Sequence, residues 1–290
     1  MKKGNRKADY IIVGVLLLLF AAVIFSVAVR TKQTSGISPG EYPEQSSGQN
    51  GTIVDHSTPV SYFSGKTIGT GTGNVFDDII EKSIPGVQMQ YYNVYPDMLT
   101  ALINEKIDAI CIDEPVIKYI LAQNTYPVEI LDEKLENYSY GFVFPKTEQG
   151  EELRDEFNEF IEDLKESGEL DEIENRWFSA NPDTSVIPDG DETASPKGTL
   201  ELAVDTTNPP FVYLDTGRPV GYEIDIAHRF CREYGYRLEI RDMSFDAIIS
   251  SISSEMCDFG CSVITITEER KQSVYFSEPD YNGGAVLVVK

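Results

Sequence analysis

Residues 265–270, TITEER, place two hydroxyl groups and a guanidinium in one short segment that follows the apolar stretch CDFGCSV. A strand that ends in hydroxyl residues, with Arg270 one turn further on, suits the capture of a carboxylate. Backbone N–H groups and the Thr265 hydroxyl would meet one oxygen, while the guanidinium would bind both oxygens as a fork. The alternative is an Arg270 that pairs with Glu268 or Glu269 at the solvated start of a helix.

Asp113 is a second candidate, because it ends the apolar run AICI and stands before Glu114 and Pro115. Open α/β sheets bind ligands at the carboxyl ends of their parallel strands, and a carboxylate there would hold an ammonium group. The same residue would also serve as the N-cap of a helix that begins at Pro115. The sequence leaves both interpretations open.

The glycine-rich segment 68–74, IGTGTGN, follows an expected strand and opens an expected helix. Its alternating glycines differ from the dinucleotide fingerprint G-x-G-x-x-G, and no Gly-Lys-Ser/Thr of a P-loop is present. A helix N-terminus that binds a small anion, such as an amino-acid carboxylate, fits the segment. A tight strand-to-helix turn fits it equally.

Phe245 and the segment 205–213, DTTNPPFVY, are candidates for the wall of an apolar slot. Phe211 and Tyr213 within that segment are also typical core residues. Cys257 and Cys261 lie about 13 Å apart if the chain between them is extended, which is too far for a disulfide. No Ser/His/Asp or Cys/His arrangement can be assembled, so the sequence predicts a protein that is not an enzyme and needs no cofactor.

The elements that must position these residues alternate between strand and helix, which predicts an α/β fold with two regions. In the first region we expect strands at 66–70, 88–92, 109–112 and 140–145 and helices at 75–82, 96–105, 115–123 and 151–178, the last broken at Gly168. In the second we expect strands at 200–204, 237–241, 259–263 and 285–289 and helices at 224–233 and 246–254.

The two regions share an internal echo, DMLTALINEKIDAIC and DAIISSISSEMCDFGC. Each segment begins with an acidic residue, continues through a helix with one apolar face, and reaches an Asp that precedes a buried strand. The spacing differs by one residue. Two similar α/β lobes joined by crossing strands are typical of a hinged binding protein.

Residues 10–29, YIIVGVLLLLFAAVIFSVAV, form an uncharged run of the length that a helix needs to cross a bilayer. Four basic residues precede the run and two follow it, which favours a cytoplasmic N-terminus and an extracellular or periplasmic body. We therefore expect an uncleaved, single-pass cell-membrane anchor, with a cleaved signal peptide ending near residues 26–28 as the alternative. Residues 1–9 would be a cytoplasmic tail and residues 30–62 a flexible tether.

The charge of the chain excludes one class of partner. The 290 residues include 24 Lys and Arg against 48 Asp and Glu, a net charge of −24. Residues 1–32 hold six of the basic and one of the acidic residues, which leaves 18 against 47, or −29, for the rest. Such a body would repel nucleic acid and anionic lipid.

Several segments resemble the amino-acid-type extracellular solute-binding proteins, the periplasmic binding proteins of polar amino-acid ABC transporters. In the second region these are LELAVDTTNPPFVYLDTGRPVGYEIDIAHRFCREYGY and CDFGCSVITITEERKQSVYFSEPDY, and in the first GKTIGTGTGN, ALINEKIDAICIDEP and LKESGELDEIENRWF. The resemblance covers residues 63–178 and 199–290. It implies the two-lobed type 2 periplasmic-binding-protein fold, also called the Venus flytrap.

The order of the segments differs from that of the family, in which lobe I comes first. Here the resemblance implies lobe II at 63–145, the C-terminal-type helices that pack on lobe I at 146–178, a linker at 179–198, and lobe I at 199–290. A circularly permuted single domain is our prediction, and a piece of a tandem array is the alternative.

The resemblance also implies a ligand site. Arg270 would pair with the α-carboxylate of an amino acid, helped by Thr265 and the backbone of Val263, and Asp113 would receive the α-ammonium. Asn74 and Thr72 would add carboxylate contacts. The side-chain pocket would be bordered by Phe245, Asp205 and Asn208, the last in place of an aromatic residue that often stacks on the ligand.

The sequence thus predicts a membrane-tethered module that captures a small, polar amino acid by hinge closure and serves an ABC transporter permease. A ligand-sensing ectodomain of a signalling receptor is the alternative. A dehydratase-like enzyme on the same fold is disfavoured, because Arg270 and Asp113 together form an amino-acid clamp.

Overall fold

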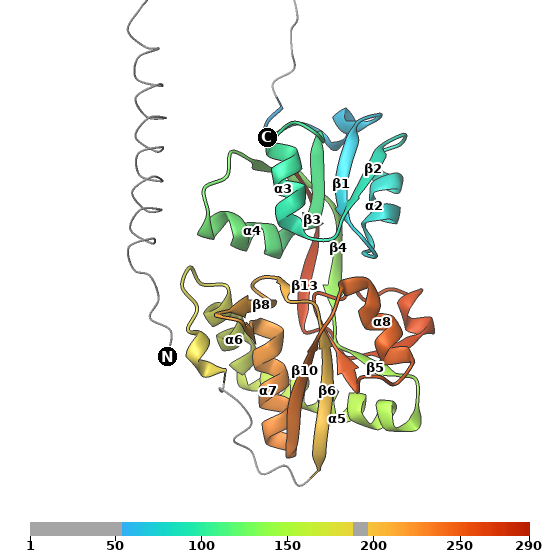
Figure 1. Ribbon diagram of the computed structural model, residues 1–290, viewed down its shortest axis with the longest axis vertical. Helices are drawn as coiled ribbons and strands as arrows, with labels where there is room; N and C mark the ends of the chain where they lie inside the picture. The colour runs from blue at the N-terminus through green and yellow to red at the C-terminus, as the bar shows by residue number, and fades with distance from the viewer. Residues whose placement is uncertain (1–53, 188–196) are drawn as a thin grey trace, which may run out of the picture. The chain divides into compact units, whose positions relative to one another are not determined.

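The computed structural model describes residues 54–187 and 197–290. In this part of the chain two five-stranded sheets form the centres of two lobes (Figure 1). A smaller sheet of three short strands, β7 (Thr207–Asn208), β8 (Val212–Asp215) and β9 (Arg218–Val220), accompanies them. Both lobes alternate strands with helices, so the expected α/β class is confirmed.

Lobe II is built on a sheet of order β2-β1-β3-β13-β4. Its strands are β1 (Thr67–Gly71), β2 (Gln88–Tyr92), β3 (Ala109–Asp113), β4 (Glu129–Tyr140) and β13 (Tyr281–Val289). Its helices are η1 (Val60–Phe63), α2 (Phe76–Ser83), α3 (Tyr95–Ile103) and α4 (Glu114–Gln123). Strands β1, β2 and β3 are parallel, whereas β13 runs antiparallel to both β3 and β4.

The central strands of lobe II are buried on both faces, as a sheet between two helical layers requires. Ile110 and Ile112 of β3 belong to the cluster that includes α3 and α4, whereas Ala109 and Cys111 belong to the cluster that includes α2. The alternation follows the two-residue period of a strand. The predicted buried strand at the apolar run AICI is therefore confirmed.

Lobe I is built on a sheet of order β10-β6-β11-β5-β12. Its strands are β5 (Val143–Pro145), β6 (Gly198–Val204), β10 (Tyr236–Asp242), β11 (Phe259–Gly260) and β12 (Val274–Phe276). Its helices are α5 (Glu148–Ser167), α6 (Glu169–Trp177), α7 (Tyr222–Tyr234) and α8 (Phe245–Ser253), with short η2 (Thr184–Val186) and η3 (Arg270–Gln272). The α7 side holds the larger core cluster, and α8 covers the opposite face.

The long helical stretch after β5 divides as the sequence predicts. Thr147 caps α5, since its hydroxyl accepts a hydrogen bond from the Gly150 N–H at 3.1 Å. Gly168 ends α5 in the left-handed region with φ of 82°, a conformation that suits glycine. The predicted break at Gly168 is confirmed, and α6 starts directly after it.

Two strands carry the chain between the lobes. The chain leaves lobe II at Tyr140 and enters lobe I at Val143, and it returns between Phe276 and Tyr281. Strands β4 and β13 pair with each other antiparallel, with Tyr140 opposite Tyr281. Figure 1 shows both strands reaching from the lobe II sheet toward lobe I.

The structure corrects four of the predicted boundaries. Residues 281–289, expected in lobe I, form β13 in the middle of the lobe II sheet, because the run AVLVV is apolar enough to be buried between two strands. Residues 143–145, expected in lobe II, form β5 in the lobe I sheet. In the expected tether, Val60 is buried in the core that holds Ile68. In the expected linker, Ile187 is buried and its carbonyl accepts a hydrogen bond from Arg218.

The predicted membrane anchor, residues 10–29, lies outside the described residues, as do residues 188–196 of the linker. Within residues 54–187 and 197–290, none of the helices combines the length and apolar character that a bilayer crossing needs. The permuted order of the lobes stays a prediction.

The internal echo corresponds to the same local structure in both lobes. After α3, Glu105 has a positive φ of 56°, and after α8, Glu255 has the same φ. Asp108 then accepts a hydrogen bond from the Thr67 N–H at 2.9 Å, and Asp258 accepts one from the Glu201 N–H at 2.7 Å. Each aspartate therefore fixes the strand that follows a helix to the neighbouring parallel strand.

A buried carboxylate joins α6 to α7. Asp225, 3% exposed, accepts hydrogen bonds from the Trp177 indole N–H at 3.0 Å, from Arg176 at 2.9 Å and from Arg229 at 2.7 Å. Trp177 is itself fully buried, so its N–H has no route to water. Asp225 therefore fastens the helices after β5 to the helix that follows the β9 hairpin.

We expect Asp225→Ala to lower the free energy of unfolding by about 2–3 kcal/mol. This is less than the loss for a fully buried ion pair, because both arginines are partly exposed and regain water. Urea unfolding followed by circular dichroism measures the change. Asp171→Ala, which removes an exposed acid from α6, is the control, and an equal loss in the two variants would contradict this role of Asp225.

Candidate functional site

A cleft lies between the two lobes, and its cavity volume is about 80 Å³. It opens where β1 and β3 of lobe II and β6 of lobe I end, at the carboxyl ends of parallel strands. Every ligand residue predicted from the sequence lines this cleft: Thr72, Asn74, Asp113, Asp205, Asn208, Phe245, Val263, Thr265 and Arg270.

Arg270 joins the two lobes across the cleft. Its guanidinium donates to the Thr265 carbonyl of lobe I at 3.1 Å and to the Gly73 carbonyl of lobe II at 3.2 Å. The guanidinium also lies 5.5 Å from the centre of the Phe245 ring. Burial lowers the pKa of Arg270 from its usual value, while Asp113 and Glu269 act in the opposite direction. The structure does not show Arg270 in a surface ion pair, because its guanidinium donates to two backbone carbonyls.

Asp113 faces two tyrosines and does not cap a helix. It occupies the N-cap position of α4, but its side chain makes no capping hydrogen bond. One carboxylate oxygen instead accepts from the Tyr140 hydroxyl at 2.6 Å and from the Tyr138 hydroxyl at 2.9 Å. Burial raises the pKa of Asp113 to about 6, and the two tyrosines and Arg270 limit that rise. The carboxyl is therefore ionised at neutral pH.

Thr72 and Asn74 lie in the turn between β1 and α2. The Thr72 hydroxyl donates to Asn93 at 3.2 Å, and the Asn74 side-chain oxygen accepts from the Phe76 N–H at 3.0 Å. Asn74 thus stabilises the first turn of α2. Gly73, between them, has φ of 78° and packs so tightly that an added Cβ would lie 2.9 Å from the Asp246 Cβ.

Asp205 supports the cleft wall through its own hydrogen bonds. Its carboxylate accepts from the Thr207 N–H at 2.9 Å, from the Thr207 hydroxyl at 2.7 Å and from the Phe245 N–H at 3.0 Å. The last contact fixes the first residue of α8, so Asp205 sets where the Phe245 ring stands. Asn208 donates to the Asp205 carbonyl at 3.4 Å.

Val263 differs from its predicted role. Its backbone N–H, expected to meet a ligand carboxylate, donates to both carboxylate oxygens of the buried Glu223 at 3.1 and 3.2 Å. Val263 therefore offers its side chain to the cleft. Thr265 pairs with Tyr140 in an isolated bridge, which places it where the chain crosses between the lobes.

Three residues at the site were not predicted from the sequence: Tyr138 and Tyr140, the partners of Asp113, and Glu223, the partner of Val263. Tyr138 and Tyr140 belong to β4, whose twelve residues carry no clear alternation of apolar and polar side chains. Glu223 is 40 residues from Val263 along the chain. No local pattern could have indicated either contact.

The lobes also touch beside the cleft. The Gln123 side chain of lobe II donates to the Ala180 carbonyl at 2.8 Å. The rings of Tyr119 in α4 and Tyr213 in β8 have centroids 6.3 Å apart. These contacts, together with the Arg270–Gly73 contact, describe lobes in contact around the cleft.

The arrangement can bind a zwitterion. Arg270 supplies a fixed positive charge with a geometry that matches a carboxylate, and Asp113 supplies a negative charge for an ammonium. In residues 54–187 and 197–290, no group of three or more His, Cys, Asp and Glu residues lies close enough to hold a metal ion.

Comparison with known proteins concerns mainly lobe I. The profile of the bacterial extracellular solute-binding proteins, family 3, matches residues 200–290. The arginine-binding extracellular protein ArtP of Bacillus subtilis is 31% identical over 96 residues, which are 33% of this chain and 38% of that protein. The L-cystine-binding protein TcyJ of Escherichia coli is 30% identical over 95 residues, 32% of this chain and 36% of that protein. The chain thus matches less than half the length of these relatives.

Two solved structures illustrate the range of likeness. An ancestral arginine-binding protein bound to arginine is 40% identical over 29% of this chain and 37% of its own, with a TM-score of 0.28. A phosphate-binding protein of a phosphate ABC transporter from Streptococcus pneumoniae covers 78% of this chain and 88% of its own at 13% identity, with a TM-score of 0.38. At these TM-scores neither structure adds to the argument on the fold. The profile match and the curated relatives show that residues 200–290 are similar to the bacterial extracellular solute-binding proteins, family 3.

Proposed function

We propose that the cleft captures a small, polar L-α-amino acid and that the lobes close on it by bending where β4 and β13 cross between them. The observation that carries the proposal is the presence of Arg270 from lobe I and Asp113 from lobe II in one cleft. The relatives include an arginine-binding and an L-cystine-binding protein, and their names support an amino acid as the ligand. Those names also favour binding over catalysis.

Each residue has a distinct role in this proposal. Arg270 binds the α-carboxylate with the Thr265 hydroxyl beside it, and Asp113 binds the α-ammonium. Thr72 and Asn74 approach the carboxylate from the lobe II turn. The ligand side chain lies against a wall lined by Phe245, Val263, Asn208 and Asp205.

The cellular setting is part of the proposal. The body would stand outside the cell, held by residues 10–29, and would deliver its ligand to the permease of an ABC transporter. The extracellular family of residues 200–290 supports the outside location. The basic residues on both sides of the apolar run support the orientation.

The first test is a thermal-shift screen of the full chain against the common L-amino acids and L-cystine. A ligand that binds only the folded state raises the unfolding temperature as its concentration exceeds the dissociation constant. We expect at least one amino acid to do so, and Arg270→Ala to abolish the shift. Loss of the charge-assisted fork weakens binding by about 3 kcal/mol, or more than a hundredfold.

Lys271→Ala is the matched control, because it removes an exposed positive charge from the adjacent residue. It should keep the wild-type shift. Arg270→Lys keeps the charge but loses the fork, so an intermediate shift is expected. An Arg270→Ala variant that responds to the ligand as the wild type does would refute the assignment of the carboxylate site.

The second test is the pH dependence of binding. The Asp113 carboxyl, whose pKa burial raises to about 6, must be ionised to receive the ammonium. Ligand affinity should therefore fall as the pH drops from 7 through 6, by at most about tenfold per pH unit for one linked proton. Isothermal calorimetry between pH 5 and pH 7 measures this limb.

Asp113→Asn should bind the ligand weakly, and its affinity should not fall further at acidic pH, since the asparagine side chain keeps the shape of aspartate and cannot ionise. Asp246→Asn, with the same chemical change in an exposed residue of the opposite lobe, should retain the limb. Persistence of the acid limb in Asp113→Asn would show that another group causes it.

A further inference from the structure

Tyr92 lines the cleft from lobe II and takes no part in the ligand contacts proposed above. It is the last residue of β2, at the carboxyl end of a parallel strand, where open α/β sheets bind their ligands. Its carbonyl accepts a hydrogen bond from the Thr72 N–H at 3.0 Å, which fixes Tyr92 beside the turn that follows β1. The sheet therefore holds Tyr92 in the wall of the cleft.

The Tyr92 ring has room beside β1 because residue 69 is a glycine. A Cβ on Gly69 would lie 3.2 Å from an edge carbon of the Tyr92 ring and 2.7 Å from a methyl group of Ile107. Glycine within a strand often marks such a close approach by a neighbour. The missing side chain of Gly69 thus lets an aromatic ring pack against β1 at this place.

The hydroxyl of Tyr92 lacks a hydrogen-bond partner within residues 54–187 and 197–290, although its oxygen is buried. Burial, with Asp97 as a smaller cause, raises the pKa of Tyr92, so the hydroxyl keeps its proton at physiological pH. A buried donor without a partner costs free energy, and a ligand atom that accepts its hydrogen bond would regain that cost. The position of Tyr92 therefore favours a ligand with an acceptor atom at this wall.

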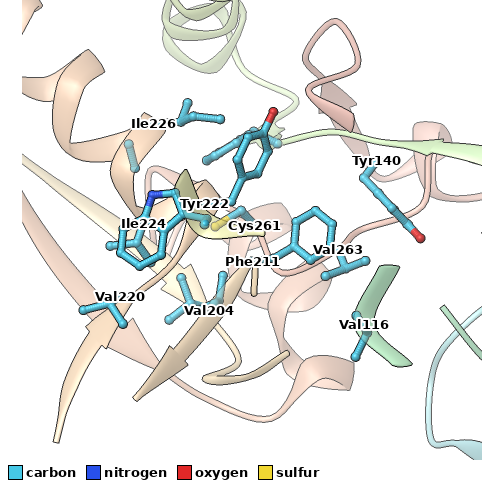
Figure 2. Packing of buried hydrophobic residues seen from close by; sticks show 14 of the residues in the cluster. Val116, Tyr140, Val204, Phe211, Val220, Tyr222, Ile224, Ile226, Cys261 and Val263 are labelled. Atoms are coloured by element: carbon cyan, nitrogen blue, oxygen red, sulfur yellow. The ribbon is translucent and has the colours of Figure 1, made fainter. Parts of the chain in front are cut away.

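The wall around Tyr92 is largely apolar. From lobe II the same cleft is lined by Val94, Tyr95, Met98, Ile112 and Val116, and from lobe I by Val263. Figure 2 shows Val116 and Val263, which belong to one buried apolar cluster. Such a wall accepts the carbon chain of a ligand and penalises a charge at its end.

The charged groups of the cleft already have partners. Among the described residues that line it, Asp113 and Asp205 are the acids and Arg270 is the base. In the proposed function Asp113 receives the α-ammonium and Arg270 the α-carboxylate. Each oxygen of Asp205 accepts a hydrogen bond from its own lobe, from Thr207 or Phe245. A charged ligand side chain would therefore meet no uncommitted opposite charge.

We propose that Tyr92 selects the side chain of the ligand, and that the ligand is an α-amino acid with an uncharged carboxamide side chain. The Tyr92 hydroxyl donates to the carboxamide oxygen, while the methylene groups of the ligand contact the apolar wall. This assignment rests on the proposed function for the orientation of the amino acid, and it adds the chemical class of the side chain.

The first test measures the affinity of the full chain for amino acids of matched shape by isothermal calorimetry. L-glutamine is compared with L-glutamate and L-methionine, and L-asparagine with L-aspartate and L-leucine. L-arginine is added as the cationic probe. We expect a carboxamide to bind at least about tenfold more tightly than its charged and apolar counterparts and than L-arginine. Tighter binding of any charged or apolar member of the panel would overturn the proposal.

The second test is Tyr92→Phe, which removes only the hydroxyl. Affinity for the carboxamide ligand should fall about tenfold, while affinity for its apolar counterpart should not fall. The unfolding temperature of the unliganded variant should not decrease, because the hydroxyl has no partner to lose. Wild-type affinity for the carboxamide ligand in Tyr92→Phe would refute the role of the hydroxyl, and a lower unfolding temperature would indicate a structural one.

Tyr91→Phe is the matched control, because it makes the same chemical change in the adjacent residue of β2. The Tyr91 hydroxyl donates to Asp77 at 2.8 Å on the exposed side of the strand, outside the lining of the cleft. This variant should bind the carboxamide ligand as the wild type does. An equal loss of affinity in Tyr91→Phe and Tyr92→Phe would contradict a specific role of Tyr92.

The panel also separates the two proposals. If a charged amino acid binds best and its binding requires Arg270, the proposed function stands and the assignment of the side chain is wrong. If no member of the panel binds, the proposed function and the assignment of the side chain both fail.

Discussion

The hydrogen bond from Tyr140 to Asp113 is the contact on which the cleft depends. A buried carboxylate stays ionised at neutral pH only if donors and opposite charges surround it, and Tyr140, Tyr138 and Arg270 supply these. Tyr140 is also the last residue of β4, where the chain leaves lobe II. Its hydroxyl fits because Gly283 of the paired strand lacks a side chain: a Cβ there would lie 2.4 Å from the hydroxyl oxygen. The charge in the site and the path of the chain between the lobes are therefore set by one side chain.

The two lobes share one local arrangement, which joins a helix to the next parallel strand. In both, a helix ends in a turn with a positive φ, and an aspartate then fastens the next strand to its parallel neighbour. These contacts are short in sequence or lie within one lobe. The lobes depend on each other covalently only through the crossings at β4 and β13 in the described part of the chain. Such a fold places few demands on the order in which its lobes occur along the chain, which is consistent with the predicted permutation.

Sequence reasoning was strongest where local rules decide the outcome. Asp113 was found because a carboxylate at the end of an apolar strand lies at the carboxyl edge of an α/β sheet, and Arg270 because it follows a strand that ends in hydroxyl residues. Asp205 was indicated by the segment 205–213 and by the family resemblance. It was weakest where partners are distant. Nothing near Val263 indicates that its N–H is taken by Glu223, and nothing in residues 281–289 indicates which of two sheets receives the strand. The burial of Val60 could not be predicted either, because a short apolar element among polar residues resembles a flexible tether in the sequence.

The net charge of the protein and the charges inside the cleft have separate effects, and only the charges inside the cleft select the ligand. The excess of acidic residues outside residues 1–32 is spread over a surface that salt screens within about 8 Å, so it supports solubility and disfavours polyanionic partners. Among the described residues, the buried carboxylates of Asp113 and Asp225 act on their neighbours at hydrogen-bond range. Arg270 and Asp113 offer a zwitterion its two complementary charges, while Asp205 has its oxygens committed to Thr207 and Phe245. Because the surrounding walls are largely apolar, these local charges are weakly screened. The positions of the charges in the cleft, and not the net charge of the chain, therefore select the ligand.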